Sequence, residues 1–305
     1  MEMMAEDGRV TIKLYRTLPE RRRIVERLTE IGGRLLEGCI WDERRCCLYF
    51  VDIEKFRIYC WKEGEELACL PMHTYVSAIV LREDGTLAAA LQDGLYQVDF
   101  EKRTYSKRMD SGFPANIRYN DGKCDQYGDF WAGSMYVDQN EAGAKEGGSL
   151  FCIRDGAVAA RYPSYTIPNG LDWKDGYFFH TETSEKKISV YCQEESVRGD
   201  IGKKVSEIDL SEEMGAPDGM CIDRDGNLWI AMWGGAQVIG YDPEKKEIFE
   251  RIPVPAKNVS CCILGGKEGN RLFITTAEDE YSKGEVYTTL LTNHYGKAGY
   301  RYGGR

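Results

Sequence analysis

Three oxygen-bearing residues, each followed by glycine, are the strongest candidates for chemistry in this sequence. They are Glu37, Asn169 and Asp218. Carboxylate and amide oxygens suit hard divalent cations such as Ca²⁺ or Mg²⁺, and they can also hold Mn²⁺ or Zn²⁺. The glycine that follows lets the backbone turn sharply away from the site. Taken singly, Asn-Gly and Asp-Gly are common turn signals, so their spacing must decide between a turn and a ligand.

A pattern repeated along the chain gives these residues the same position in successive units. A turn signal, an apolar and aromatic strand and a second strand recur about six times. Equivalent points in the repeat are Leu48, Leu87, Phe130, Tyr177, Leu228 and Leu272. Their spacings of about 39 to 51 residues are typical of four-stranded propeller blades. The sequence therefore predicts an all-β fold, a six-bladed β-propeller.

The residue about ten positions before each marker should occupy the same place in every blade. These residues are Glu37, Ser77, Asn120, Asn169, Asp218 and Ser260. The innermost strand of each blade runs along the central channel, so we expect six polar side chains to converge at one end of it. Carboxylates crowded there would repel each other unless a cation or a proton intervened, which favours a metal site in the channel.

We expect one propeller domain over residues 1–305. Residues 1–34 form a lead-in, residues 35–291 the blades and residues 292–305 a C-terminal tail. Val10–Tyr15 alternates apolar and polar residues and is the predicted ring-closing strand of the last blade. Two polar insertions, Val137–Gly148 and Gln193–Gly215, should lie outside the core, and either could cover the channel mouth. No long helix is expected.

Composition and charge exclude several functions. The 305 residues are 42% hydrophobic and 30% charged, and the formal net charge is −10, which disfavours nucleic acid as a partner. The N-terminus lacks the pattern of a signal peptide, and no apolar run reaches the length of a membrane span. The eleven cysteines are odd in number and mostly fall in predicted strands, so we expect reduced thiols and a soluble, cytoplasmic protein.

Other catalytic patterns are missing. Ser134 lies in an AGSMY segment and not in a GxSxG elbow, and His73, His180 and His294 occur in no metal-binding or triad-like context. His180 is expected to be a packed residue. No glycine-rich phosphate or dinucleotide motif is present, so no organic cofactor is implied. The tryptophans that recur near the strand markers are expected to pack blade on blade.

Five ordered motifs carry a resemblance to a known family. They are LLEGCIWDERRCCLYFVDI, IRYNDGKCDQYGDFWAGSM, IPNGLDW, APDGMCIDRDGNLWIAMWGGAQVIGYDP and VSCCILGG. In this order they resemble the family of senescence marker protein (regucalcin), gluconolactonases and luciferin-regenerating enzymes. The resemblance runs from about Leu35 to about Tyr287, most of the chain.

This resemblance implies a six-bladed propeller with one divalent cation in its channel, which could be Ca²⁺, Zn²⁺, Mn²⁺ or Mg²⁺. By motif position the metal-binding residues would be Glu37, Asn169 and Asp218. Arg118 and Asn120 would contact a sugar-lactone substrate. A further acidic residue of the family falls near Asp138, in a variable loop.

Three positions depart from the family pattern. Leu36 stands where the first glycine of Gly-Glu-Gly is usual, Pro168 stands where a serine precedes Asn-Gly, and Glu182 replaces an Asp. These departures leave the candidate ligands in place. They change the residues around them, and therefore the hydrogen bonds that hold the ligands and the preference for a substrate.

The expected activity is metal-dependent opening of a sugar lactone to the aldonic acid by a monomeric enzyme of carbohydrate metabolism. Asp218 would be the general base, and Arg118 and Asn120 would position the substrate. Two alternatives stay open. One is a phosphotriesterase-like or other ester hydrolase that uses the same cation, and the other is a calcium-binding or ligand-binding propeller without turnover.

Overall fold

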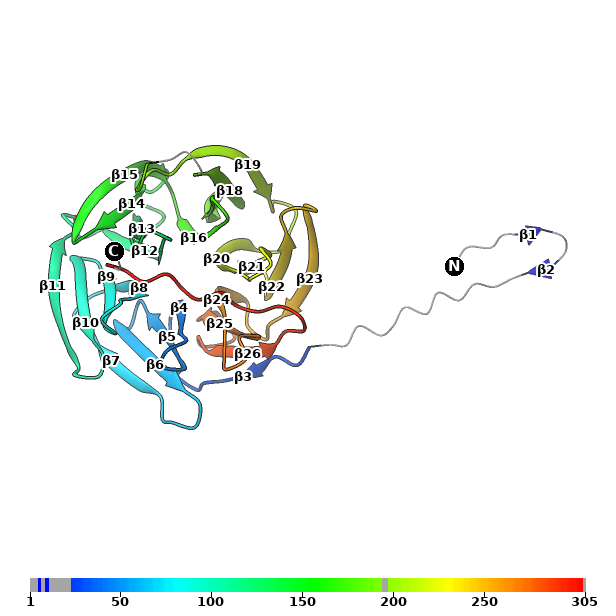
Figure 1. Ribbon diagram of the computed structural model, residues 1–305, viewed down its shortest axis with the longest axis horizontal. Helices are drawn as coiled ribbons and strands as arrows, with labels where there is room; N and C mark the ends of the chain where they lie inside the picture. The colour runs from blue at the N-terminus through cyan, green and yellow to red at the C-terminus, as the bar shows by residue number, and fades with distance from the viewer. Residues whose placement is uncertain (1–4, 7–8, 11–22, 194–196, 304–305) are drawn as a thin grey trace.

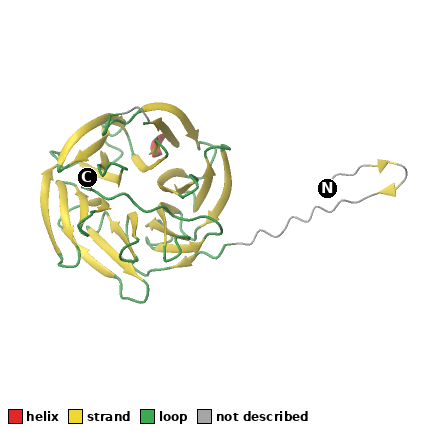
Figure 2. Ribbon diagram, in the orientation of Figure 1, coloured by secondary structure: helices red, strands yellow, loops and turns green. Residues whose placement is uncertain are grey.

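Six four-stranded antiparallel sheets form a closed ring in the computed structural model, which describes residues 5–6, 9–10, 23–193 and 197–303 (Figure 1). The predicted six-bladed β-propeller is confirmed. Strands dominate the ring (Figure 2), and the helix in the described residues is a short 3-10 turn, η1 (Thr183–Glu185). In this part of the chain no helix is long and apolar enough to cross a membrane.

The blades follow one another along the chain. Blade one comprises β4 (Leu36–Asp42), β5 (Cys47–Asp52), β6 (Arg57–Lys62) and β7 (Ala68–Pro71). Blade two comprises β8 (Val76–Leu81), β9 (Leu87–Leu91), β10 (Gly94–Asp99) and β11 (Thr104–Asp110). Blade three comprises β12 (Ile117–Cys124), β13 (Phe130–Tyr136), β14 (Gly148–Arg154) and β15 (Ala157–Tyr165).

The other three blades repeat this order. Blade four comprises β16 (Pro168–Lys174), β17 (Tyr177–Glu182), β18 (Lys187–Cys192) and β19 (Lys203–Asp209). Blade five comprises β20 (Ala216–Ile222), β21 (Leu228–Trp233), β22 (Gln237–Asp242) and β23 (Glu247–Pro253). Blade six comprises β24 (Asn258–Gly265), β25 (Arg271–Ala277), β26 (Val286–Leu290) and β3 (Glu26–Arg27).

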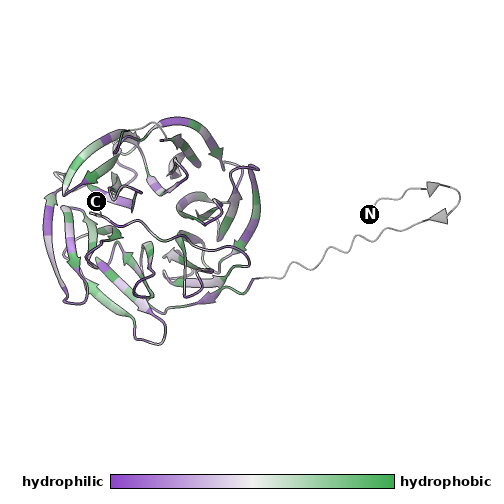
Figure 3. Cartoon of the chain, in the orientation of Figure 1, coloured by the Kyte–Doolittle hydropathy of each residue, from purple (hydrophilic) through white to green (hydrophobic). Residues whose placement is uncertain are grey.

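The hydrophobic core is divided among the interfaces between blades. A buried cluster lies between each pair of neighbouring blades, six in the described residues. Trp41 stacks on Phe273 across blades one and six, with ring centroids 5.3 Å apart, and Trp131 lies 6.2 Å from Trp173 across blades three and four. The expected packing role is therefore confirmed for these tryptophans. Hydrophilic residues recur along the outer strands (Figure 3).

The ring is closed by β3, which pairs with β26 through Arg27 opposite Tyr287 and Glu26 opposite Thr288. The prediction that an N-terminal strand closes the ring holds, but Val10–Tyr15 was the wrong segment. Val10 belongs to β2 (Arg9–Val10), which pairs with β1 (Ala5–Glu6), and residues 11–15 lie outside the described residues.

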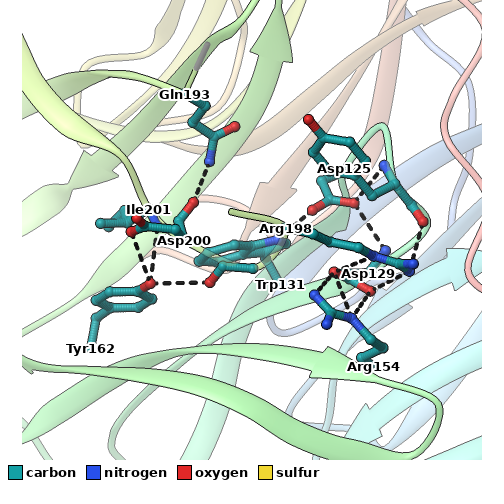
Figure 4. A network of polar contacts seen from close by, with 11 residues as sticks. Asp125, Asp129, Trp131, Arg154, Tyr162, Gln193, Arg198, Asp200 and Ile201 are labelled. Carbon is teal, nitrogen blue, oxygen red and sulfur yellow. Dashed lines mark hydrogen bonds and ion pairs between the residues drawn. The ribbon is translucent and has the colours of Figure 1, made fainter. Parts of the chain in front are cut away.

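The segment Gln193–Gly215 is not wholly an irregular insertion, because β19 lies within it. Residues 197–202, which precede β19, are tied to blade three (Figure 4). Arg198 and Arg154 both pair with the buried carboxylate of Asp129, each at 2.8 Å. Tyr162 donates a hydrogen bond to the Gly199 carbonyl and accepts one from the Ile201 amide, both at 3.0 Å. These contacts fix the segment to the outside of the ring.

Residues 292–303, here called the C-terminal strap, cross the ring (Figure 1). The strap lies at the ends of the inner strands, where Gly296 and Lys297 line a small cavity together with Trp41, Leu81 and Ile222. It contacts all six blades, through Asp42, Leu81, Gly156, Asp172, Asp223 and Gly269. The strap therefore covers one end of the channel and links the whole ring.

Candidate active site at the open end of the channel

The first strand of each blade lines the channel, because these six strands contact one another around the ring. Each has a break in its pairing register near the predicted polar residue. In β16, for example, the register shifts between Pro168 and Leu171, and in β20 between Pro217 and Met220. Such bulges release a residue from the ladder and redirect its side chain. Repetition of the bulge turns the polar residues toward the axis.

A cavity of about 510 Å³ opens where these bulges meet. Four of the six predicted residues line it, namely Glu37, Asn120, Asn169 and Asp218, together with Arg118. The two serines are buried but do not line the cavity. Ser260 donates instead to the Leu36 carbonyl of the next blade. The predicted convergence therefore holds for the four residues with longer side chains.

A chain of hydrogen bonds orients the two amides. Arg118 donates from Nη1 to Asn120 Oδ1 at 2.8 Å, and Asn120 Nδ2 donates to Asn169 Oδ1 at 2.9 Å. Asn169 Nδ2 donates to Thr183 Oγ1 at 2.9 Å, and that hydroxyl donates to the Pro217 carbonyl at 2.8 Å. The Asn169 oxygen keeps one lone pair free of this chain. It can therefore serve as a ligand in a fixed orientation.

The surroundings of the site's carboxyl groups disfavour their ionised forms. Burial, followed by the charge of Asp121, raises the pKa of Glu37 to about 8. Burial, followed by the charges of Glu37 and Asp121, raises the pKa of Asp218 well above its usual range. Arg118 offsets only part of this effect, because its charge lowers the pKa of Glu37 by less than burial and Asp121 raise it. The site therefore favours either protons on these carboxyls or an added cation.

The residues present fit a divalent cation. Asp218 lines the cavity, and its Oδ1 is buried and has no hydrogen-bond partner within the described residues, so a bound cation would satisfy an oxygen that the chain leaves unpaired. Glu37 accepts one hydrogen bond, from the Gly38 amide at 3.0 Å. No group of three or more His, Cys, Asp or Glu side chains suited to a metal occurs in the described part of the chain. A cation would therefore need the Asn169 amide oxygen beside the two carboxylates.

A family model described as the SMP-30/Gluconolactonase/LRE-like region matches residues 35–278. The chain belongs to this family. Regucalcin of Gallus gallus is 30% identical, over 81% of this chain and 84% of its own length. A Bacillus subtilis protein with the provisional name sugar lactone lactonase YvrE is also 30% identical, over 82% and 86% of the two chains. The structure of an Agrobacterium tumefaciens regucalcin aligns with a TM-score of 0.81 and 22% identity over 92% and 97%.

Glu182, one of the departures from the family pattern, organises the approach to Asn169. Its carboxylate accepts hydrogen bonds from the Thr166 and Ile167 amides, each at 2.9 Å, and from the Ser184 hydroxyl at 2.7 Å. These bonds tie the loop that leads into β16 to the end of β17 and to η1. In this member of the SMP-30/gluconolactonase family the longer carboxylate therefore supports a candidate ligand indirectly.

Asp138 does not reach the cavity, and the assignment made from the resemblance is corrected here. It is exposed at the start of the 137–147 loop. Its Oδ1 accepts hydrogen bonds from the backbone and side-chain nitrogens of Asn140, both at 2.9 Å, so it stabilises a local turn. The next residue, Gln139, lines the cavity instead. The 137–147 loop thus contributes to the mouth, but through a neutral amide.

Sequence reasoning missed most of the rim. Glu54, Met135, Thr183, Trp233 and Ala277 all line the cavity. Each lies at or just after the end of the second strand of its blade, and those ends lie at the same side of the ring as the starts of the inner strands. These residues recur at the end of the second strand of each repeat, just as the candidate ligands recur at the start of the first strand, so the period of the repeat is the signal that identifies them. Trp233 is therefore a rim residue and not a purely packed one.

Proposed function

We propose that this protein is a divalent-cation-dependent hydrolase that opens a sugar lactone to the aldonic acid. The observation that carries the proposal is the unsatisfied, buried Asp218 Oδ1 beside Glu37 and an oriented Asn169 in an open cavity. Family membership and the name of the Bacillus subtilis relative support a lactone as the substrate. When bound, a divalent cation would polarise the lactone carbonyl and balance the charge that develops on its oxygen.

Asp218 is the proposed general base. It lies at the bulge of β20, and with Oδ1 on the cation its second carboxylate oxygen would accept a proton from an attacking water. A base must lose its own proton before it can act, and the raised pKa of Asp218 in the metal-free site opposes that. Positive charge in the site lowers the pKa of a carboxyl. Cation binding and base strength are therefore linked at Asp218.

Arg118 is the proposed substrate-positioning residue. A guanidinium has five N–H donors, and the two hydrogen bonds that Arg118 makes to described residues use only Nη1. The remaining donors are available for hydroxyls or the ring oxygen of a lactone. Asn120 has both N–H donors occupied, by the Pro168 carbonyl and by Asn169. We therefore assign Asn120 mainly to holding Arg118 and Asn169 in place.

The rim favours a second candidate, hydrolysis of a phosphotriester or of another ester with an apolar part. Met135, Ile167 and Trp233 form an apolar portion of the lining, while Arg34, Glu54 and other polar side chains complete it. An apolar wall would bury a hydrophobic substituent that sugars lack. Both candidates use the same carboxylates and differ in the group that the rim accepts.

The deciding experiment measures acid release from glucono-δ-lactone by chelator-stripped protein. Ca²⁺, Zn²⁺, Mn²⁺ and Mg²⁺ are added back one at a time, and spontaneous hydrolysis is subtracted. Asp218→Asn should eliminate the metal-dependent rate. Asp175→Asn is the matched control, because that carboxylate is exposed and pairs with Lys174 at the surface; it should retain the full rate.

Two results would contradict the proposal. Release that is independent of added cation would remove the metal from the reaction, and release that persists in Asp218→Asn would remove the base. Cation binding without any release would favour either the ester substrate or a binding propeller. The same assay with an aryl ester and a phosphotriester separates those two outcomes.

A further inference from the structure

A second polar layer lies beneath the candidate site, on the same strands. Lys123 follows Asn120 by three residues on β12, and Asp172 follows Asn169 by three residues on β16. Along a strand, three residues span roughly 10 Å. This layer therefore sits deeper in the channel than the site, toward the end that the strap covers.

Asp172 connects this layer to the strands that carry the candidate ligands. Its exposed fraction is 3%. Its carboxylate pairs with Lys123 at 3.1 Å and accepts hydrogen bonds from the Trp173 amide at 2.8 Å and the Ile222 amide at 3.0 Å. Burial by itself would raise the pKa of Asp172, but Lys123 and Lys297 lower it to about 2. Asp172 is therefore ionised and joins blade four to blade five.

Lys123 completes the connection. Its ammonium donates a hydrogen bond to the Met220 carbonyl at 2.8 Å, in addition to its contact with Asp172. Met220 follows Asp218 by two residues on β20. The pair of Lys123 and Asp172 thus bridges β12, β16 and β20, the strands that carry Asn120, Asn169 and Asp218. Its contacts lie two to four residues beyond those residues on each strand.

The C-terminal strap fixes this pair from below. Lys297 Nζ contacts Asp172 Oδ1 at 2.7 Å and donates to the Trp173 carbonyl. Between the strap and the inner strands a cavity of only about 60 Å³ remains, lined in part by Lys123, Cys124 and Cys221. Lys297 therefore closes the channel and supplies the second cation that the buried carboxylate contacts.

We propose that Lys123 and Asp172, locked by Lys297, are positioning residues that hold Asn169 and Asp218 at the spacing that a cation requires. The proposal rests on the proposed function, because it treats Asn169 and Asp218 as cation ligands. Buried ion pairs are often no more stabilising than apolar packing. Their directional contacts, however, fix three strands relative to one another, which apolar contacts do less strictly. Through Lys297 the C-terminal strap would thus support the site from the covered end of the channel.

The experiment compares cation affinity in the full-length protein and in Lys297→Met. Mn²⁺ and Ca²⁺ titrations are run well below the unfolding temperature, so that a loss of stability alone does not change the dissociation constant. Residues that hydrogen-bond a metal ligand directly typically contribute roughly 10- to 100-fold in affinity. Lys297 acts one contact further away, through Asp172, so we expect Kd to rise by about 10-fold, the lower end of that range. Lys297→Arg keeps the charge and should restore much of the affinity.

Lys257→Met is the matched control, because Lys257 is exposed and its ion pair with Glu280 spans 3.8 Å at the surface. Its Kd should equal that of the unmodified protein.

A second readout, the rate of cysteine labelling, needs no metal. Cys124 and Cys221 line the small cavity under the strap, so maleimide labelling mapped by mass spectrometry should speed up at both in Lys297→Met. Cys47, buried between blades one and two, should stay protected and so report that the ring is folded.

Each outcome decides the proposal. An unchanged Kd in Lys297→Met, with Cys124 and Cys221 labelled faster, would overturn it, because the strap would then only seal the channel. Equal losses in Lys257→Met and Lys297→Met would also overturn it. If Cys47 is labelled too, Asp172→Asn, which removes the charge that both lysines contact, replaces Lys297→Met and the same Kd criterion applies.

A protein that binds no cation would refute the proposed function separately. Labelling of Cys124 and Cys221 would then report only whether the strap seals the channel. A protein that binds a cation with the same Kd in Lys297→Met would instead refute the positioning layer and leave the proposed function standing.

Discussion

Glu37→Gln should stabilise the metal-free protein while weakening its binding of a cation. The pKa of Glu37 in the folded protein is about 8, against an ordinary value of 4.5. Between those pH values the folded state holds a proton that the unfolded state has lost, so the contribution of Glu37 to stability is full below pH 4.5 and is lost as pH rises toward 8. Over this range the free energy of unfolding falls by about 1.4 kcal/mol per pH unit, so the ionisation of Glu37 costs about 3 kcal/mol of stability at pH 7.

Glutamine resembles the protonated form of Glu37 and keeps an acceptor for the Gly38 amide. It avoids this loss, so the melting temperature of chelator-treated Glu37→Gln should exceed that of the unmodified protein by about 5 °C at pH 7. The difference should vanish near pH 4.5 and grow toward pH 8. Saturating cation should reverse the order, because ligand binding stabilises only the protein that binds it.

The assay is thermal unfolding followed by circular dichroism from pH 4.5 to pH 8, with and without cation. Glu65→Gln serves as the control, because Glu65 is exposed at the surface, and it should melt like the unmodified protein at every pH. A chelator-treated Glu37→Gln that melts lower at pH 7, or a difference that does not depend on pH, would refute the reasoning about the buried carboxyl.

Three further substitutions test the assigned roles. Asp218→Asn should abolish turnover and leave the circular dichroism spectrum unchanged; near-normal rates would remove Asp218 as the base. Arg118→Ala should raise KM more than it lowers kcat, because a residue that only positions the substrate acts mainly through binding; a loss confined to kcat would assign it to the chemical step. Asp138→Asn should leave kcat/KM unchanged, because Asp138 is exposed and does not line the cavity, and a clear loss would place Asp138 at the substrate.

The inner layer of the site was predictable because it follows the repeat. Each inner strand has its bulge at the same phase, so a residue counted back from a strand marker falls at the same height in the channel. Glu37, Asn169 and Asp218 were found in this way. Ser77 and Ser260 have the same phase, but a hydroxyl is too short to line the cavity. Phase alone therefore predicts position and not participation.

Contacts distant in sequence were not predictable. The ring closes through Glu26 and Arg27, a strand of two residues that carries no alternating pattern. The strap reaches Asp172 from residue 297, and no local signal in the tail indicates that Lys297 enters the channel. Asp138 was misplaced because a turn within the 137–147 loop captures its carboxylate. In each case tertiary contacts, and not local preference, determine the outcome.

The height along each strand separates three tasks in this ring. The bulges of the inner strands bring candidate ligands together, the ends of the second strands form the rim, and the Lys123–Asp172 layer joins the strands below. Glu54 lies in the turn after β5 and Trp233 at the end of β21, whereas Asn169 and Asp218 lie on β16 and β20, so a change at the rim need not move the ligands. A variant of Trp233 should therefore alter which lactone or ester is preferred while cation affinity stays the same. A parallel loss of cation affinity would show that rim and ligands are coupled.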